Sequence, residues 1–122
     1  FNQKNIIFTG FVNQSQLIIY YNLSKIFVLP SKYEPWGLSV NEAMNCNNAL
    51  LLSSNVGCGA DLLKKNKNGL IFRFNQKKDL KLKMLNFVRN RRKLFKMRKY
   101  SKKIINNWDI DYAKKCFLET IN

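Results

Sequence analysis

The sequence contains no histidine and only seven acidic residues. Without histidine, the chain has no imidazole for general acid–base catalysis and no Ser-His or Cys-His nucleophile. Its three cysteines (Cys46, Cys58 and Cys116) match no metal-binding or redox spacing, so we expect free thiols in a reducing, cytoplasmic compartment. No apolar run approaches the ~20 residues of a membrane span, and no signal-peptide pattern is present.

The length and the apolar content indicate one folded domain. The chain has 122 residues, of which 46% are hydrophobic. A chain of this size buries roughly 65% of its unfolded surface, which is enough for a sizeable core. The first residue is Phe1 rather than Met, so we expect the chain to be a piece of a longer protein.

Positive charge dominates the sequence. The chain contains 22 lysines and arginines and seven acidic residues, which gives a net charge of +15. Such a balance favours anionic partners, namely phosphates, nucleic acid or an acidic membrane surface. The chain is also rich in Lys, Asn and Ile, a bias that an AT-rich genome would produce without selection for binding. Composition alone leaves both interpretations open.

Short apolar runs alternate with helical patterns in the first two-thirds of the chain. We predict strands at residues 6–8, 26–29, 49–52 and 70–72, the second of them buried on both faces. Helices are expected after a Ser15 cap, over 37–46 with Asn47 closing the helix, and over 60–64. This alternation predicts an α/β fold with a Rossmann-like, doubly wound parallel sheet. A hairpin at Asn68-Gly69 is the less favoured alternative.

The last third of the chain is strongly basic. Residues 77–103 contain thirteen lysines or arginines and a single acid, Asp79. Apolar residues recur at helical spacing, which predicts two amphipathic helices with a break near Asn90 and a final helix after Asp109. The cations form either a solvated helix surface or a peripheral contact with an anionic membrane that carries a lipid-linked acceptor. No recognisable nucleic-acid module is present, and we expect no nucleic-acid partner.

In an open parallel sheet, ligands bind beyond the carboxyl ends of the strands, where three loops are expected. They span residues 9–12, 30–37 and 53–59. The second loop leads directly into a helix, so the backbone N–H groups of Gly37, Leu38 and Ser39 would point outward. A helix N-terminus carries about half a positive charge and binds anions. A diphosphate fits this position.

Two carboxylates flank this predicted helix start. Glu34 precedes the helix and Glu42 lies one turn inside it. Direct contact with a phosphate would be repulsive, whereas each carboxylate can accept hydrogen bonds from hydroxyl groups. A sugar hydroxyl at one end and a ribose hydroxyl at the other form a coherent assignment. Each acid also has a simpler interpretation, Glu34 as a solvated loop residue and Glu42 as a residue serving the helix dipole.

The sequence around the two acids carries a family resemblance. Glu34-Pro35-Trp36-Gly37-Leu38 and Glu42-Ala43-Met44 follow Leu29-Pro30-Ser31, and this segment resembles the Glu-x7-Glu motif of retaining glycosyltransferases of family 4. The resemblance covers roughly residues 6–74. It implies that residues 1–122 are a partial nucleotide-sugar-binding domain, one half of a GT-B fold. The implied activity is retaining hexosyl transfer from a nucleoside-diphosphate sugar to an unknown sugar or lipid-linked acceptor, in polysaccharide, lipopolysaccharide or glycolipid synthesis.

The resemblance also implies residue roles and requires no cofactor and no metal. Glu34 would be the catalytic residue and a ligand of the donor sugar, and Glu42 would bind the ribose. From its own chemistry, the Trp36 side chain is expected to pack and shape its loop, and the alternative is a platform on which a ligand stacks. The backbone around the helix start would approach the sugar and the diphosphate, at Trp36, Gly37, Leu38 and Ser39. The first loop would lie near the base, at Gly10, Phe11 and Val12.

The sequence departs from the family pattern at two places. Asn47-Asn48-Ala49 replaces a common Gly-x-Pro, and Ser24-Lys25 replaces a common Ala-Asp. The family's Arg and Lys diphosphate ligands and its acceptor domain lie upstream of the region that these residues match. We therefore expect the chain alone to be inactive. The alternative function is a non-catalytic, basic α/β module that binds nucleic acid or a membrane surface.

Overall fold

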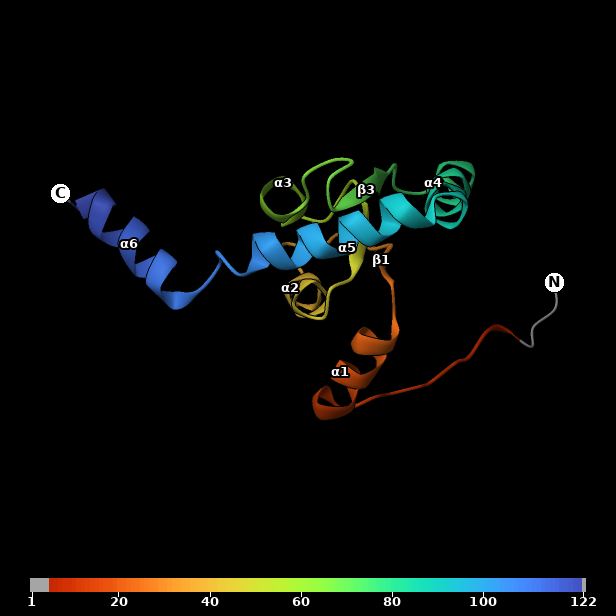
Figure 1. Cartoon of the computed structure of the whole chain (residues 1–122), viewed down its shortest axis with the longest axis horizontal. Helices are drawn as coiled ribbons and strands as arrows, with labels where there is room; N and C mark the ends of the chain where they lie inside the picture. The colour runs from red at the N-terminus through yellow and green to blue at the C-terminus, as the bar shows by residue number, and fades with distance from the viewer. Residues whose placement is uncertain (1–4, 122) are drawn as a thin grey trace.

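A computed structural model of the protein describes residues 5–121, which form an α/β fold around a parallel sheet (Figure 1). The sheet has three strands in the order β1-β2-β3, and both strand pairs are parallel. The parallel pairing confirms the predicted α/β class and rules out a hairpin at Asn68-Gly69. In chain order, the elements are α1 (Gln14–Leu23), β1 (Ile26–Leu29), α2 (Leu38–Asn45), β2 (Ala49–Ser53), α3 (Gly59–Leu62), β3 (Gly69–Phe72), α4 (Lys77–Arg89), α5 (Arg91–Ile105) and α6 (Ile110–Ile121).

β2 is the centre of the core, because all five of its residues are buried. Successive side chains of a strand point to opposite faces of the sheet. Leu50 and Leu52 accordingly pack in one cluster with residues of α2, whereas Leu51 packs in a second cluster with residues of α4 and α5. Helices therefore cover both faces of the sheet, as a doubly wound arrangement requires.

β1 is less buried than its four apolar residues predict. Ile26 to Leu29 are all partly exposed. The prediction that this strand is buried on both faces was wrong, because β1 is the outer strand of the described sheet and only β2 lies beside it. Its alternating side chains still reach the two core clusters, Phe27 and Leu29 on one face and Ile26 and Val28 on the other.

The strand predicted at residues 6–8 does not form. These residues are irregular and exposed, with Phe8 92% exposed, and they run away from the sheet beyond α1 (Figure 1). A strand needs a neighbour that accepts and donates its backbone hydrogen bonds. Within residues 5–121 no strand lies beside this segment, so its apolar pattern alone does not produce one.

Local polar contacts set the helix ends. The cap of α1 is Asn13 rather than the predicted Ser15: the Asn13 side chain accepts a hydrogen bond from the Gln16 N–H at 3.0 Å. Ser15 lies inside the helix and donates its hydroxyl to Asn13 Oδ1. After α2, Asn47 adopts a positive φ of 59°, which confirms its predicted role as the residue that closes the helix.

The basic C-terminal region forms the helices that its spacing predicts. α4 and α5 meet at Asn90, whose side chain accepts a hydrogen bond from the Lys93 N–H at 2.9 Å and so caps α5. α5 packs on α2 and β2, whereas α6 projects away from the body of the molecule (Figure 1). Among the helices in residues 5–121, none combines the length and the apolar character needed to cross a bilayer.

We predict that Gly69→Ala lowers the free energy of unfolding by about 1–3 kcal/mol, the usual cost of overpacking a core. A Cβ at Gly69 would lie 2.4 Å from the Leu50 carbonyl oxygen, at the first paired position of β2 and β3. The measurement is urea unfolding of the purified protein.

Gly59→Ala is the matched control for this substitution. A Cβ at Gly59, in α3, would meet only Leu52 Cδ1 at 3.9 Å, so stability should stay equal or rise slightly. Equal stabilities for the two variants would contradict the close approach of β2 and β3 at Gly69.

Candidate functional site

Two loops at the carboxyl edge of the sheet are joined through their backbones. The Glu34 N–H donates to the Asn55 carbonyl at 3.2 Å, and the Gly57 N–H donates to the Glu34 carbonyl at 2.8 Å. A third bond runs from the Cys58 N–H to the Trp36 carbonyl at 3.2 Å. The loop that follows β1 therefore has a fixed path between the sheet and α2.

Polar side chains from the end of β2 reinforce this loop pair. The Ser53 hydroxyl donates to the Ser31 carbonyl at 2.6 Å, and the Asn55 side-chain amide donates to the Lys32 carbonyl at 2.8 Å. Ser53 is almost fully buried, so its hydrogen bond is formed away from water. Both side chains satisfy carbonyl groups of a segment that has no regular secondary structure.

Gly57 permits the close approach of the two loops. A Cβ at this position would lie 1.9 Å from the Pro35 carbonyl oxygen, well inside van der Waals contact. Gly57 is therefore required because another backbone occupies the space of its side chain, and the sequence had identified it only as a loop residue.

The start of α2 carries unpaired backbone donors. Gly37 precedes the helix in the left-handed region, with φ at 96°, and Val40 N–H donates back to the Gly37 carbonyl at 2.8 Å. Within residues 5–121, the N–H groups of Gly37, Leu38 and Ser39 find no acceptor. The first turn of α2 also contains no acidic residue that would neutralise the positive end of the helix. Free donors at the positive end of a helix suit an anion, and anion binding at this position stays a prediction.

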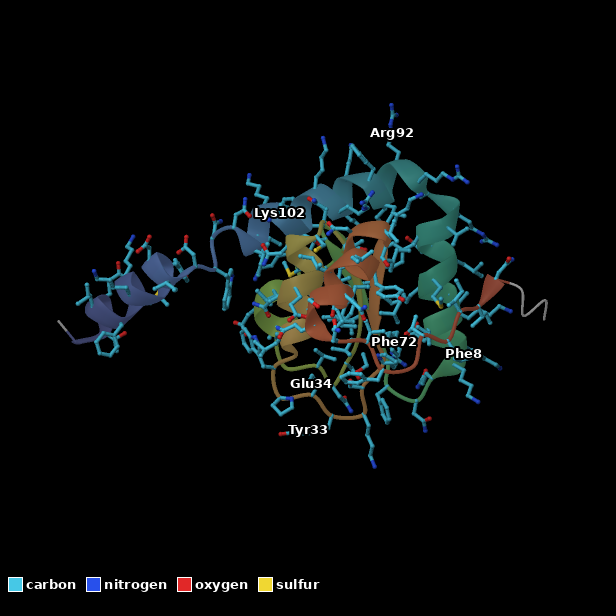
Figure 2. All side chains as sticks on the ribbon, turned by 90° about the horizontal axis from the view of Figure 1, so that it is seen from below. Phe8, Tyr33, Glu34, Phe72, Arg92 and Lys102 are labelled. Atoms are coloured by element: carbon cyan, nitrogen blue, oxygen red, sulfur yellow. The ribbon has the colours of Figure 1, made fainter. Side chains whose placement is uncertain are left out.

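Glu34 lies against this helix start. Its Cγ is 3.2 Å from the position that a Cβ on Gly37 would occupy, so the side chain covers the glycine. In Figure 2, Glu34 and Tyr33 lie on the loop at one end of the molecule. The half-buried carboxylate forms neither a salt bridge nor a side-chain hydrogen bond with any described residue. Its oxygens are available to accept hydrogen bonds from a ligand.

Glu42 lies on α2, one turn inside the helix, and faces α1. Its Oε2 accepts a hydrogen bond from the Tyr21 hydroxyl at 3.2 Å. A pocket of about 260 Å³ opens beside this pair, between α1 and the C-terminal end of α2. Its walls are mostly apolar and consist of Gln14, Leu17, Ile18, Tyr21, Glu42, Asn45 and Cys46.

Two groups near these acids have raised pKa values. Burial raises the pKa of the Tyr21 hydroxyl, and the charge of Glu42 adds to the effect. Burial also raises the pKa of the Cys58 thiol to about 11, with a smaller contribution from Glu34. Both groups therefore stay protonated at neutral pH, so Tyr21 is a hydrogen-bond donor and Cys58 is a poor nucleophile.

The other residues predicted near the diphosphate differ in their surroundings. The Trp36 ring is half-buried against the core, and its indole N–H donates to Asn41 Oδ1 at 3.2 Å, which confirms a packing role for the side chain. Leu38 is 72% exposed, and only its backbone forms part of the helix start. The Ser39 hydroxyl forms no hydrogen bond with the described residues and remains free for a ligand.

The structure does not place Gly10, Phe11 and Val12 in a pocket. Gly10 has nothing within 4 Å of a potential Cβ, and the Phe11 side chain is 96% exposed. The neighbouring Phe8 lies well apart from Glu34 in Figure 2. Contact of this segment with a base therefore stays a prediction from the sequence. Among residues 5–121, no three His, Cys, Asp or Glu side chains gather as metal ligands.

The sequence analysis missed Tyr21 and Asn48 as parts of the site. Asn48 is fully buried, and its side-chain amide donates to the Tyr21 carbonyl at 2.8 Å and to the Ala43 carbonyl at 3.1 Å. It thus joins the end of α1 to α2 beside Glu42. The only available signal was an asparagine directly before the most apolar strand, where a polar residue needs a specific partner.

Comparison with known proteins places this chain in a family. The family model described as "Glycosyl transferases group 1" matches residues 1–104. The serotype-specific mannosyltransferase WbdA of Escherichia coli is 47% identical over 55 residues, which are 45% of this chain and 7% of that protein. The chain therefore corresponds to a small part of that relative.

Solved structures show which fold the chain shares. Sucrose-phosphate synthase of Thermosynechococcus elongatus superposes with a TM-score of 0.80 at 23% identity, over 93% of this chain and 29% of that chain. Anabaena HepE, solved in complex with UDP, superposes with a TM-score of 0.73 at 17% identity, over 84% of this chain and 28% of that chain. These neighbours are GT-B proteins, so the chain has the architecture of half a GT-B fold.

We predict that Gly57→Ala separates the two loops and increases alkylation of Cys58 by iodoacetamide at pH 8. In the unaltered protein, Cys58 is buried, and its pKa of about 11 keeps the thiolate scarce at this pH. The variant should expose the thiol and bring its pKa closer to the ordinary value. Peptide mass spectrometry gives the labelling rate, with the exposed Cys116 as the internal reference. An unchanged Cys58 rate would contradict the tight loop pair.

Proposed function

This chain belongs to the glycosyl transferases group 1 family, and we propose that it supplies the donor side of a retaining glycosyl transfer. The donor would be a nucleoside-diphosphate sugar, and the acceptor a sugar or a lipid-linked sugar. The observation that carries the proposal is the start of α2, where three unpaired N–H groups lie between two acids that have no cationic partner among the described residues. Anion binding and hydroxyl recognition thus occur side by side.

Each group has a separate role in the proposed complex. The N–H groups of Gly37, Leu38 and Ser39 bind the diphosphate, and the helix dipole stabilises its charge. Glu34 accepts hydrogen bonds from hydroxyls of the donor sugar and serves as the catalytic residue. Glu42 accepts hydrogen bonds from the ribose. The structural neighbour HepE was solved in complex with UDP, which supports a nucleotide ligand for a protein of this fold.

The proposed chemistry depends on positioning and on leaving-group stabilisation. As the bond between the anomeric carbon and the diphosphate breaks, negative charge accumulates on the diphosphate, and the start of α2 stabilises it. The two carboxylates do not flank the scissile bond in this assignment, so they do not form the acid and nucleophile pair of a glycoside hydrolase. Cationic diphosphate ligands and the acceptor site would come from the rest of the protein, and no metal is invoked.

The names of the relatives support a proposal for the class of sugar and the setting. The E. coli relative is named a serotype-specific mannosyltransferase. We therefore take a hexose as the donor sugar and place the reaction in polysaccharide, lipopolysaccharide or glycolipid synthesis. A cytoplasmic location agrees with the three unpaired thiols of Cys46, Cys58 and Cys116.

A basic stripe on α5 supports a second element of the proposal, contact with an anionic membrane. Four cations at positions 92, 96, 99 and 103 lie on one exposed face of the helix, and no acid lies among them. Phe95 is exposed beside them, with Lys99 Nζ 4.7 Å from the centre of its ring. Cations next to an aromatic ring suit the interface of a bilayer. Arg92 lies at the opposite end of the molecule from Glu34 in Figure 2, so membrane contact leaves the donor loops free.

We predict that Glu42→Gln weakens binding of nucleoside diphosphates by about 10- to 100-fold, the range for losing hydrogen bonds to a charged group. Glu34→Gln should instead weaken binding of the sugar nucleotide and abolish turnover while the nucleoside diphosphate still binds. Isothermal titration of the intact protein with UDP, GDP and their sugars measures the affinities, and an assay of sugar transfer measures turnover.

Glu119→Gln is the matched control for both acids. Glu119 is exposed on α6 and forms a surface pair with Lys115, far along the chain from the site. Its substitution should change neither affinity. Saturable nucleotide binding that survives Glu42→Gln unchanged would contradict the assigned ribose contact, and salt-sensitive DNA binding without nucleotide binding would support the basic-module alternative.

We predict that replacing the four cations of the α5 stripe by glutamine reduces binding to vesicles that contain phosphatidylserine. Each basic residue near an anionic surface contributes about 1 kcal/mol, so the quadruple variant should lose most of its vesicle affinity. Vesicle co-sedimentation measures the change. A control variant with the same loss of charge replaces exposed lysines elsewhere, and equal losses for the two variants would show that only net charge matters. The control substitutes Lys32, Lys64, Lys65 and Lys114.

A further inference from the structure

The hydrogen bond between Tyr21 and Glu42 links α1 to the candidate site. The Tyr21 hydroxyl donates to Glu42 Oε2 at 3.2 Å. Within residues 5–121, this is the only hydrogen bond between side chains that joins α1 to another element. α1 buries none of its residues completely, so a half-buried tyrosine at its last turn is one of few contacts that fix the helix.

Two further contacts hold the Tyr21 side chain and backbone in place. Its ring meets the ring of Phe27 on β1 edge to face, with 5.8 Å between the centroids. Its carbonyl accepts a hydrogen bond from the buried Asn48 amide, which also binds the carbonyl of Ala43, the residue after Glu42. A single amide thus sets the spacing between the backbone of Tyr21 and the backbone of the residue that follows Glu42.

From this geometry we infer that Tyr21 is a positioning residue for the ribose-binding carboxylate, an inference that rests on the proposed function. The hydroxyl occupies one oxygen of Glu42 and fixes the rotamer of the side chain. The second oxygen then remains free to accept hydrogen bonds from the ribose hydroxyls. A carboxylate held in its binding orientation loses less conformational freedom when the ligand arrives.

The protonation state of the pair agrees with this role. Burial and the charge of Glu42 keep the pKa of Tyr21 above its ordinary value, so the hydroxyl remains a donor throughout the neutral range. No salt bridge competes for Glu42 within the described residues. Tyr21 forms no hydrogen bond with Glu34 or with the first residues of α2, so its effect on a ligand is expected to pass through Glu42.

The test compares Tyr21→Phe with Tyr20→Phe in the intact protein. Tyr21→Phe removes only the hydroxyl and keeps the ring contact with Phe27. The neighbouring Tyr20 is 44% exposed, and its hydroxyl forms no hydrogen bond with the described residues, so Tyr20→Phe is the matched control. Affinities are measured by isothermal titration for UDP and GDP and for their 2′,3′-dideoxy analogues, which lack the ribose hydroxyls.

The expected result is a selective loss. Tyr21→Phe should bind UDP or GDP about tenfold more weakly, whereas its affinity for the dideoxy analogue should match that of the unaltered protein. In a Glu42→Gln background, Tyr21→Phe should have no further effect. Tyr20→Phe should change none of these affinities.

Three outcomes would overturn the inference, and they are distinguishable. Equal loss for normal and dideoxy nucleotides would mean that Tyr21 only supports the fold, which a parallel fall in the urea midpoint would confirm. Tight nucleotide binding that Tyr21→Phe leaves unchanged would refute the positioning role while the proposed function stands. Absence of UDP and GDP binding in the unaltered protein would refute the proposed function, and with it the inference.

Discussion

The candidate site depends on the backbone hydrogen bonds between the loops that follow β1 and β2. They fix the carbonyl and N–H groups of Glu34 against Gly57 and Asn55 before the chain enters α2. The position of the α2 N-terminus at the carboxyl edge of the sheet follows from this constraint, and so does the position of the Glu34 side chain beside Gly37. Ligands of parallel sheets generally bind beyond the strand ends, and in this chain the loops at that edge hold specific hydrogen-bond donors and acceptors.

The charge distribution supports the same arrangement. The chain has 22 cations and seven acids, yet the only two salt bridges within residues 5–121 lie on helix surfaces, Lys83–Asp79 and Lys115–Glu119. Glu34 and Glu42 therefore keep acceptor oxygens that no cation occupies. In the proposed complex, the strong positive charge of the whole chain would attract a nucleotide, while the two acids would select hydroxyl groups rather than phosphates.

The sequence predicted the elements that local chemistry determines, but not those that depend on distant partners. Apolar runs identified β1, β2 and β3, and Glu34 and Glu42, with the residues around them, indicated the candidate site. The segment at residues 6–8 has the same apolar pattern, but no strand lies beside it among the described residues, so it forms none. Tyr21 and Asn48 were missed because their roles come from contacts between α1 and α2 that no local pattern encodes.

The central claim is that the start of α2 binds the diphosphate of a nucleotide. Hydrogen–deuterium exchange of the intact protein with and without saturating UDP or GDP tests it most directly. The account predicts that the nucleotide slows exchange of the amides of Gly37, Leu38 and Ser39 and leaves the basic face of α5 unchanged. Saturating nucleotide that protects α5 or other segments, with no change at these three amides, would contradict the account.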